Sequence, residues 1–279
     1  MITIVSIYNY IIGLFSAIMA ITLAVWELAK PYVGEKLLAP YDEFKESIRN
    51  DLWERKMPVY TSTQNIKFSP KVNKDTHQLL MITEKCNSQY QYPLSWEGPE
   101  LAARKRGFNV VMAKMMLDFD RSTVEQGNIY IKGKGKGRFQ YLLGISKKGR
   151  DIFFHVFDEK MQCYIETRGR THFHDYFRTG KKWVVLGIEW KFNGVKYLAR
   201  EEGEKDFVVY PFNPPPELKD EILSDSRHIY FYGLSEFCIR TDLEVRDSKF
   251  KSIIGVVDYI KVRSAYLHWF EPLKRLLGR

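Results

Sequence analysis

Apolar side chains dominate the start of the chain, as far as Trp26, and leave almost no room for charge. Residues 4–26 contain eleven Ile, Val, Leu or Phe side chains, and the only ionisable side chains before residue 27 are those of two tyrosines. A helix of 26 residues would run about 39 Å, longer than the roughly 30 Å of bilayer hydrocarbon. The pattern predicts one transmembrane helix within residues 1–30, with Trp26 at the headgroup level. A cleaved signal peptide fits less well, because no basic residue precedes the apolar stretch. A buried core helix fits less well, because such helices seldom lack charge for seven turns.

Small and polar residues recur along one side of this predicted helix at intervals of three and four. In lipid, helices associate where small residues let two backbones approach and where Ser or Asn can hydrogen-bond across them. The spacing predicts a helix that associates with itself or with a partner helix, unless the register is chance, since small residues are common in membrane spans. The residues assigned to this association are Ser6, Asn9, Gly13, Ser16, Ala17, Ala20 and Ala24.

Charge after the apolar stretch predicts on which side of the membrane the rest of the chain lies. Only after this stretch do Lys residues occur, at Lys30, Lys36 and Lys45, and the positive-inside rule then places the remainder on the cytoplasmic or matrix side. The chain has no N-glycosylation sequon, and its three cysteines are too far apart for a metal knuckle or a disulfide framework. We therefore expect a single-pass membrane protein with its C-terminal domain on that side.

The next stretch, residues 31–56, reads as a connector. Pro31 and Pro40 would interrupt a continuing helix. Phe44, Ile48 and Leu52 then fall four residues apart, and this spacing predicts a short amphipathic helix over residues 41–56.

From residue 57 to residue 264 the pattern changes to short β-rich runs separated by glycine-bearing turns. Asn193-Gly194 between two such runs predicts a β-hairpin. About ten short strands without an obvious helical period predict an antiparallel sandwich of two sheets, a jelly roll, in a mainly β protein. The predicted strands cover residues 109–115, 128–132, 139–145, 151–157, 162–167, 182–190, 195–199, 207–210, 228–232, 237–239 and 255–262.

Three of these stretches resemble the concanavalin A-like or laminin G-like sandwich family. Residues 180–190, GKKWVVLGIEW, followed by a turn and VKYL, are similar to the family's "gkWhhvaltw…lylyvdG" stretch, and residues 250–262 are similar to its closing strand. Residues 139–157 resemble the preceding hairpin. The glycine that ends the family's hairpin is replaced here by Ala199-Arg200-Glu201. The resemblance covers somewhat less than half of the chain and implies the fold more strongly than any function.

Members of that family often bind sugars, in many cases beside calcium, and some hydrolyse glycans. The hydrolases carry two carboxylates on one strand face in an E-x-D-x-x-E pattern, which does not occur in this sequence. Asp258 in the closing strand reads as a structural residue. His172 and His174 share a strand face but have no third metal ligand nearby in the sequence, so we expect neither a metal nor a cofactor.

The net charge of +9 falls entirely outside the apolar N-terminal stretch. The run Gly133-Lys134-Gly135-Lys136-Gly137-Arg138 lacks the following Ser or Thr of a phosphate loop and reads as a basic hairpin turn. The last segment, residues 265–279, mixes bulky apolar and basic residues like an amphipathic tail at a lipid interface. The basic residues predicted to contact an anionic surface, such as that of a lipid membrane, are Lys134, Lys136, Arg138, Arg168, Arg170, Lys274 and Arg275.

These features favour a protein that is not an enzyme. The leading hypothesis is an accessory subunit of a membrane complex, whose sandwich docks partner proteins while its helix assembles in the membrane. A membrane-tethered lectin that binds carbohydrate and an oligomerising, membrane-disrupting immune effector remain as alternatives. The expected partners are membrane lipid and membrane-protein subunits or further copies of the chain, with carbohydrate possible and nucleic acid disfavoured because no nucleic-acid motif occurs.

Overall fold

The computed structural model describes residues 12–14, 16–19, 38–57, 66–85, 99–148, 151–165, 183–244 and 251–265. The chain divides into two compact units, Met1–Leu38 and Ala39–Arg279. In the first unit, residues 12–14 and 16–19 are helical. No helix within the described ranges is both long enough and apolar enough to span a membrane. Most of the predicted transmembrane helix lies outside those ranges.

The second unit consists almost entirely of β-strands, with one α-helix and one 3-10 helix among its described residues. The elements are β1 (Ala39–Asp42), β2 (Trp53–Lys56), β3 (Ile66–Phe68), β4 (Lys71–Asn73), β5 (Gln78–Lys85), β6 (Glu100–Ala103), β7 (Phe108–Leu117), β8 (Gln126–Lys134), β9 (Phe139–Ser146), β10 (Asp151–Asp158), β11 (Cys163–Ile165), β12 (Val184–Lys191), β13 (Gly194–Glu201), β14 (Val208–Pro211), η3 (Pro216–Leu218), α2 (Lys219–Tyr232), β15 (Glu236–Glu244) and β16 (Lys251–Ser264).

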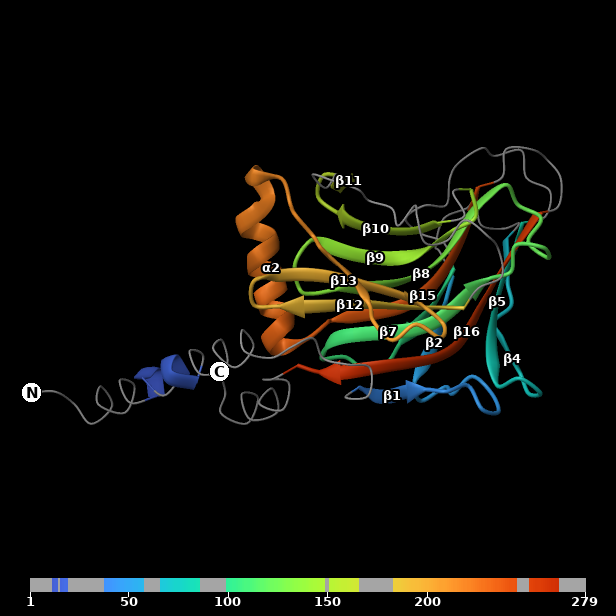
Figure 1. Cartoon of the computed structure of the whole chain (residues 1–279), viewed down its shortest axis with the longest axis horizontal. Coiled ribbons are helices and arrows are strands. Elements are labelled where there is room, and N and C mark those ends of the chain that lie inside the picture. The colour runs from blue at the N-terminus through green and yellow to red at the C-terminus, as the bar shows by residue number, and fades with distance from the viewer. Residues whose placement is uncertain are drawn as a thin grey trace, which may run out of the picture. The chain divides into compact units, whose positions relative to one another are not determined.

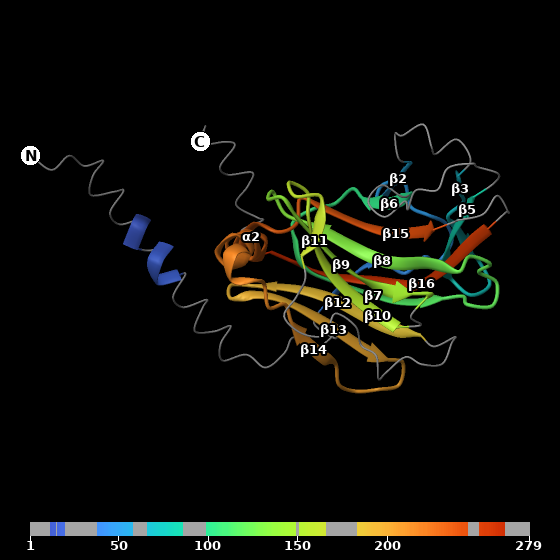
Figure 2. The ribbon, with the colours of Figure 1, turned by 90° about the horizontal axis from the view of Figure 1, so that it is seen from above.

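The described strands form two antiparallel sheets that lie face to face (Figures 1 and 2). The nine-stranded sheet has the order β14-β13-β12-β7-β16-β5-β3, with β1 also paired to β16 and β4 to β5. The seven-stranded sheet has the order β11-β10-β9-β8-β15-β6-β2. Neighbours in space are often far apart in sequence, as where β16 lies between β5 and β7. The predicted antiparallel sandwich of two sheets is therefore confirmed.

Alternation along the strands places one row of side chains between the sheets and the other row outside. In β9 the inward row is Phe139, Tyr141, Leu143 and Ile145, all buried in the main core. Each inward row faces apolar residues of the other sheet, and burial of such side chains is worth roughly 1.5–3 kcal/mol apiece. The outward row of the same strand is free to form a surface, and the candidate site lies on that surface.

The predicted amphipathic helix over residues 41–56 does not form, and residues 39–56 contain the two strands β1 and β2 instead. β1 pairs with β16 and β2 pairs with β6, so the sandwich begins at Ala39 rather than at residue 57. Phe44 and Leu52, two of the residues that suggested a helix, are buried in the core. Asp42 accepts hydrogen bonds from the Phe44 N–H at 2.9 Å and from the Trp53 Nε1–H at 2.7 Å. These bonds and the burial of the aromatic rings stabilise the strands over a local helix.

The run His228–Tyr232, predicted as a strand, is the last part of α2. This helix lies across one end of the sandwich (Figures 1 and 2) and buries Ile222 and Ile229. Aromatic and β-branched residues favour strands only weakly, and tertiary burial overrides that preference here. The hairpin predicted at Asn193-Gly194 is confirmed, because β12 and β13 pair from Lys191 opposite Gly194.

Candidate functional site

A pocket of about 250 Å³ lies on the outer face of the seven-stranded sheet. The same strands turn Ile129, Ile131 and Leu143 into the core, so their alternate residues point outward into this pocket. Pockets for drug-sized ligands typically measure roughly 300–1,000 Å³, and this one therefore suits a small ligand or a single ring of a larger one. We call it the outer-face pocket; it is lined by Asn128, Tyr130, Leu142, Ser146, Phe153, His155, Tyr164 and Asp242.

Aromatic rings form one wall of the outer-face pocket. The His155 ring lies 5.3 Å from the Phe153 ring and 5.0 Å from the Tyr164 ring, measured between centroids. Tyr130 meets Phe153 edge-on at 5.9 Å. Tyr164, on the edge strand β11, is 39% exposed, whereas Tyr130 and Phe153 are buried. Solvent therefore reaches this wall chiefly at Tyr164.

Gly144 allows Tyr130 to occupy its place in the pocket. The two residues pair across β8 and β9. A Cβ atom at residue 144 would lie 2.3 Å from the Tyr130 Cβ and 2.3 Å from the Ile129 carbonyl oxygen. No side chain fits at that separation, so the pocket floor requires glycine at this position.

Asn128 and Asp242 form the polar wall. The Asn128 Nδ2–H donates to Asp242 Oδ1 at 2.8 Å, and the two residues are paired across β8 and β15. Burial raises the pKa of the Asp242 carboxyl to about 6, against the opposing charge of Arg240 and the hydrogen bond from Asn128. Burial likewise raises the pKa of Tyr164 to about 12. The pocket thus holds a carboxyl group that takes up a proton in mildly acidic solution.

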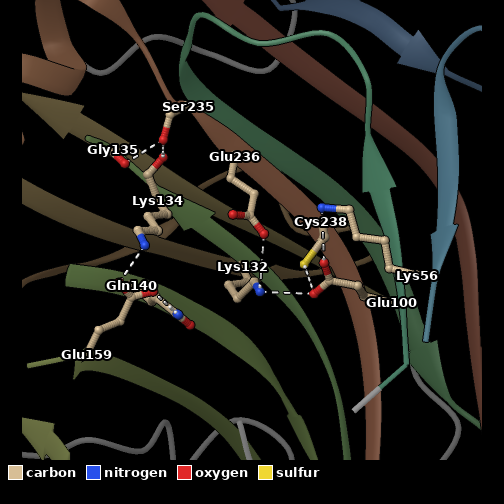
Figure 3. A network of polar contacts seen from close by, with 10 residues as sticks. All are labelled: Lys56, Glu100, Lys132, Lys134, Gly135, Gln140, Glu159, Ser235, Glu236 and Cys238. Carbon is tan, nitrogen blue, oxygen red and sulfur yellow. Dashed lines mark hydrogen bonds and ion pairs between the residues drawn. The ribbon is translucent and has the colours of Figure 1, made fainter. Parts of the chain in front are cut away.

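A second polar cluster lies on the same sheet face, toward β6 (Figure 3). Lys132 Nζ donates to Glu100 Oε2 at 2.9 Å and lies 3.5 Å from Glu236 Oε1. The Cys238 thiol donates to Glu100 Oε2 at 3.2 Å. Lys56 Nζ completes the cluster at 3.9 Å from Glu100 Oε1. We call these five residues the charge cluster.

The charge cluster neutralises itself. Burial would raise the pKa of the Glu100 carboxyl, but the charge and hydrogen bond of Lys132 lower it below its ordinary value. Burial raises the pKa of the Cys238 thiol well above its ordinary value, so this sulfur stays protonated. Two carboxylates match two ammonium groups, and the cluster therefore reads as part of the framework beside the pocket.

The glycine-rich turn at residues 133–138 holds an anion that belongs to the chain itself. A Cβ atom at Gly137 would lie 2.4 Å from Asp225 Oδ1, and Tyr141 donates to Asp225 Oδ2 at 2.9 Å. Burial raises the pKa of Asp225, opposed by the hydrogen bonds from Tyr141 and from the Gly137 backbone. The glycines make room for this carboxylate from α2, in agreement with a hairpin turn rather than a phosphate loop.

The basic residues predicted to contact an anionic surface are only partly described. Lys134 Nζ lies 2.5 Å from Glu159 Oε2, and Arg138 pairs with Asp158 at 3.1 Å. Lys136 is exposed. Arg168, Arg170, Lys274 and Arg275 lie outside the described residues, as do Ser6, Asn9, Ala20 and Ala24 of the predicted association stripe, whereas Gly13, Ser16 and Ala17 lie in the exposed helical residues of the first unit.

The residues of the outer-face pocket were not singled out from the sequence. Their signal is weak, because the strands that carry them alternate with core residues and the pocket joins five separate strands. Asp258, predicted to be a structural residue, forms an ion pair with Lys114, with 2.8 Å between Asp258 Oδ2 and Lys114 Nζ. Among the described residues, no three His, Cys, Asp or Glu side chains gather as metal ligands would.

The sequence matches no protein-family model and no curated protein. Solved structures similar to this chain include a lichenase, a β-1,3-1,4-glucanase, from a mouse hindgut metagenome (10% identity, 80% of this chain and 97% of that chain, TM-score 0.47). A β-glucanase from Bacillus licheniformis is similar at 8% identity (80% and 96%, TM-score 0.46). Lectin II from Ulex europaeus is similar at 8% identity (78% and 100%, TM-score 0.35).

These similarities contradict two predictions made from the sequence. The accessory subunit of a membrane complex is wrong as the leading hypothesis, since the similar structures are glucanases and a lectin. The prediction that the protein is not an enzyme is contradicted as well, because two of them are hydrolases. Net charge and an apolar N-terminus reflect where a chain resides and carry little information on what its sandwich binds. Likeness at this level concerns the fold, so the ligand has to be inferred from the side chains of this chain.

Proposed function

We propose that this protein is a membrane-tethered carbohydrate-binding module whose ligand site is the outer-face pocket. The observation that carries the proposal is the meeting of an aromatic wall, at His155 and Tyr164, with a polar wall, at Asn128 and Asp242, in one small pocket. A pyranose ring has the matching chemistry. Its C–H face is apolar and suits an aromatic ring, and the hydroxyl groups at its rim need donors and acceptors.

The polar wall can hold hydroxyl groups in both hydrogen-bonding senses. Asn128 has a carbonyl oxygen that accepts and a second N–H that donates. Asp242 accepts from Asn128 and, when ionised, has about four lone-pair sites in all with which to accept further hydrogen bonds. Sites built in this way reject a ligand that lacks the hydroxyl, because the buried polar groups would then lose their partners. A single sugar ring in a pocket of this size implies modest affinity, with longer glycans bound through neighbouring surface.

The test is binding of the full-length protein to a glycan array, followed by calorimetry with the best glycan. Tyr164→Ala removes the exposed aromatic ring, and we expect binding at least tenfold weaker, as for an aromatic hot spot. Phe192→Ala is the matched control, since Phe192 is equally exposed at 38% but lies in the β12–β13 turn outside the pocket. Absence of binding across a broad array, or equal losses in both variants, would reject the proposal.

A second candidate function is hydrolysis of a glycosidic bond. Asp242 favours it, because a pocket carboxyl with a pKa raised to about 6 is suited to protonating a leaving group. Two-carboxylate hydrolysis needs a partner about 5–9.5 Å away, and Asp242 is the one carboxyl among the residues that line the pocket. Release of reducing ends from β-glucans, lost in Asp242→Asn, would establish hydrolysis; binding without release would leave the module a lectin.

The tether is the membrane-spanning helix predicted within residues 1–30, and the side of the membrane that the sandwich faces stays a prediction. Extraction of the full-length protein with alkaline carbonate tests the tether directly. We expect the chain to stay with the membrane pellet. In the same membranes, replacing Asn9 and Gly13 with Leu tests the association stripe, and an unchanged assembly state would remove that part of the proposal.

A further inference from the structure

The chain enters and leaves the sandwich at the same end. Ala39, the first residue of β1, pairs with Val262 near the end of β16. Ser264, the last residue of β16, lies opposite Phe108 at the start of β7. Figure 1 shows β1 beside the arrowhead of β16. Residues before 39 and after 265 therefore connect to the sandwich at neighbouring points.

A run of three exposed cations lies at this same end. Arg104, Lys105 and Arg106 form the loop between β6 and β7 and are all exposed. The next residue, Gly107, accepts a hydrogen bond from the Ala265 N–H at 2.8 Å, which holds the loop against the end of β16. We call Ala39, the loop 104–107 and Ala265 the terminal pole.

The loop is held by its backbone and by the Arg104 side chain, which leaves Lys105 and Arg106 as the exposed cations available to a ligand. The Arg104 N–H donates to the Leu52 carbonyl at 2.7 Å, and Arg104 Nε donates to the Trp53 carbonyl at 3.3 Å. The acidic group that faces the run is Asp51, which pairs with Arg49 at 2.7 Å. With Arg49 counted, four cations lie around this loop with one carboxylate, so the loop and its immediate surroundings are positive.

The sequences that adjoin the terminal pole have the composition of membrane-associated segments. On one side, residues 4–26 carry no charge and are rich in Ile, Val, Leu and Phe. On the other side, residues 266–279 combine Trp269 and Phe270 with Lys274, Arg275 and Arg279, a mixture typical of interfacial segments. The first segment reaches Ala39 through residues 27–38, and the second begins directly after Ala265.

We propose that the terminal pole docks on an anionic membrane surface, with Lys105 and Arg106 directed at lipid phosphates. Each Lys or Arg near such a surface contributes about 1 kcal/mol, and the attraction fades within a Debye length. The segment that begins directly after Ala265 would add its own cations to the same contact.

Docking in this orientation leaves the outer-face pocket accessible. Lys134, at the end of β8, lies at the terminal pole, because it bonds Ser235 while the adjacent Leu234 bonds Phe108. Asn128, which lines the pocket, lies toward the other end of β8 and pairs with Ser146 just before the β9–β10 turn. A sandwich standing on its terminal pole would thus present the polar wall of the pocket away from the lipid.

The test compares binding of the full-length protein to vesicles of phosphatidylcholine alone and to vesicles in which phosphatidylglycerol replaces a third of that lipid, by flotation at low and high salt. The apolar N-terminal segment contributes equally to binding of both kinds of vesicle. The ratio of the affinity for anionic vesicles to that for neutral vesicles therefore isolates the electrostatic contribution to binding. Lys105→Gln with Arg106→Gln should lower this ratio about 30-fold, the equivalent of about 1 kcal/mol per cation. High salt should lower it in the wild type as well.

The matched control is Lys148→Gln with Lys205→Gln, two exposed lysines at the opposite end of the sandwich. It removes the same charge and should keep the wild-type ratio. Equal ratios for the wild type and the Lys105/Arg106 variant, or equal losses in both double variants, would overturn the proposal. Binding of an RNA oligonucleotide by the wild type without any preference for anionic vesicles would assign the cations to another partner and also overturn it.

Discussion

The outer-face pocket and the charge cluster lie on the same face of the same sheet, yet they differ in how their charges are met. In the charge cluster, Lys132 and Lys56 match Glu100 and Glu236. In the pocket, Asp242 is a buried carboxyl whose pKa is raised to about 6. The charges of the first region are balanced within it, whereas the second holds a carboxyl with a raised pKa in the wall of a pocket.

This difference separates framework from site more reliably than the amount of charge does. Buried charges that are paired and hydrogen-bonded contribute little to ligand binding, and their removal mainly costs stability. A buried carboxyl that lines a pocket and has a strongly raised pKa is characteristic of a functional position. The charge cluster should therefore respond to mutation in stability, and the pocket should respond in binding and pH dependence.

The largest effect is expected from Lys132→Met. Loss of the ammonium leaves the buried Glu100 carboxylate without its nearest partner, and we expect the free energy of unfolding to fall by about 3–5 kcal/mol at neutral pH. Urea denaturation measures this. Lys56→Met is the control, because Lys56 is 45% exposed and 3.9 Å from the same carboxylate. Similar losses of stability in the two variants would contradict the conclusion that Lys132 is the partner that neutralises the buried Glu100 carboxylate.

Asp242→Asn should change the pH dependence of stability. The folded protein binds the Asp242 proton more tightly than the unfolded chain, so the contribution of Asp242 to stability falls as pH rises from about 4 to about 6 and is then level. Two pKa units correspond to about 3 kcal/mol. The difference between wild type and Asp242→Asn should therefore shift by about that amount over this range, in favour of the variant at higher pH.

The control for this measurement is Asp75→Asn, in the exposed turn between β4 and β5. Denaturation curves at intervals of half a pH unit are recorded for both variants, so that the effect of removing an exposed carboxyl is subtracted from that of removing the pocket carboxyl. A pH-independent difference between Asp242→Asn and the wild type would mean that the pocket carboxyl is not perturbed, and the contrast with the charge cluster would disappear.

Gly144→Ala should damage the pocket and stability together. The added Cβ would lie 2.3 Å from two atoms of β8, and the resulting strain should cost about 1–3 kcal/mol while displacing Tyr130. Gly187→Ala is the control, because its nearest neighbour is the flexible end of Met112 at 3.2 Å. Thermal unfolding and glycan binding both test this. Retention of full stability by Gly144→Ala would show that the floor of the pocket is not tightly packed.

The sandwich could be predicted from the sequence because its strands alternate and its turns carry glycine. The strands β7 to β10 and the β12–β13 hairpin all lie where that pattern places them. The edge strands β1 and β2 and the helix α2 could not be predicted, because partners far away in the sequence determine them. Phe44 is an example, since its buried ring stacks on Trp53 at 6.2 Å and a local helix would not bring the two together.

The pocket could not be predicted, because its lining residues come from β8, β9, β10, β11 and β15 and share no motif. Asn128 and Asp242 are 114 residues apart in the chain and become neighbours only through strand pairing. The resemblance to concanavalin A-like sandwiches implied a sugar-binding class of protein but did not point to these side chains. Sequence reasoning instead singled out basic residues such as Lys134, which the fold places in an ion pair.

The smallest effect, and the sharpest control on the comparison, is expected for that ion pair. Lys134 lies two residues from Lys132 on the same strand and also pairs with a glutamate, Glu159, at 2.5 Å. The Lys134 and Glu159 side chains are 23% and 32% exposed, so solvent screens their attraction and can hydrate whichever partner remains. A double-mutant cycle with Lys134→Met and Glu159→Gln should give a coupling below about 1 kcal/mol. A coupling as large as the loss of unfolding free energy in Lys132→Met would show that exposure to solvent does not distinguish the Lys134–Glu159 pair from the Lys132–Glu100 pair. Burial would then not explain the contribution of the charge cluster to stability.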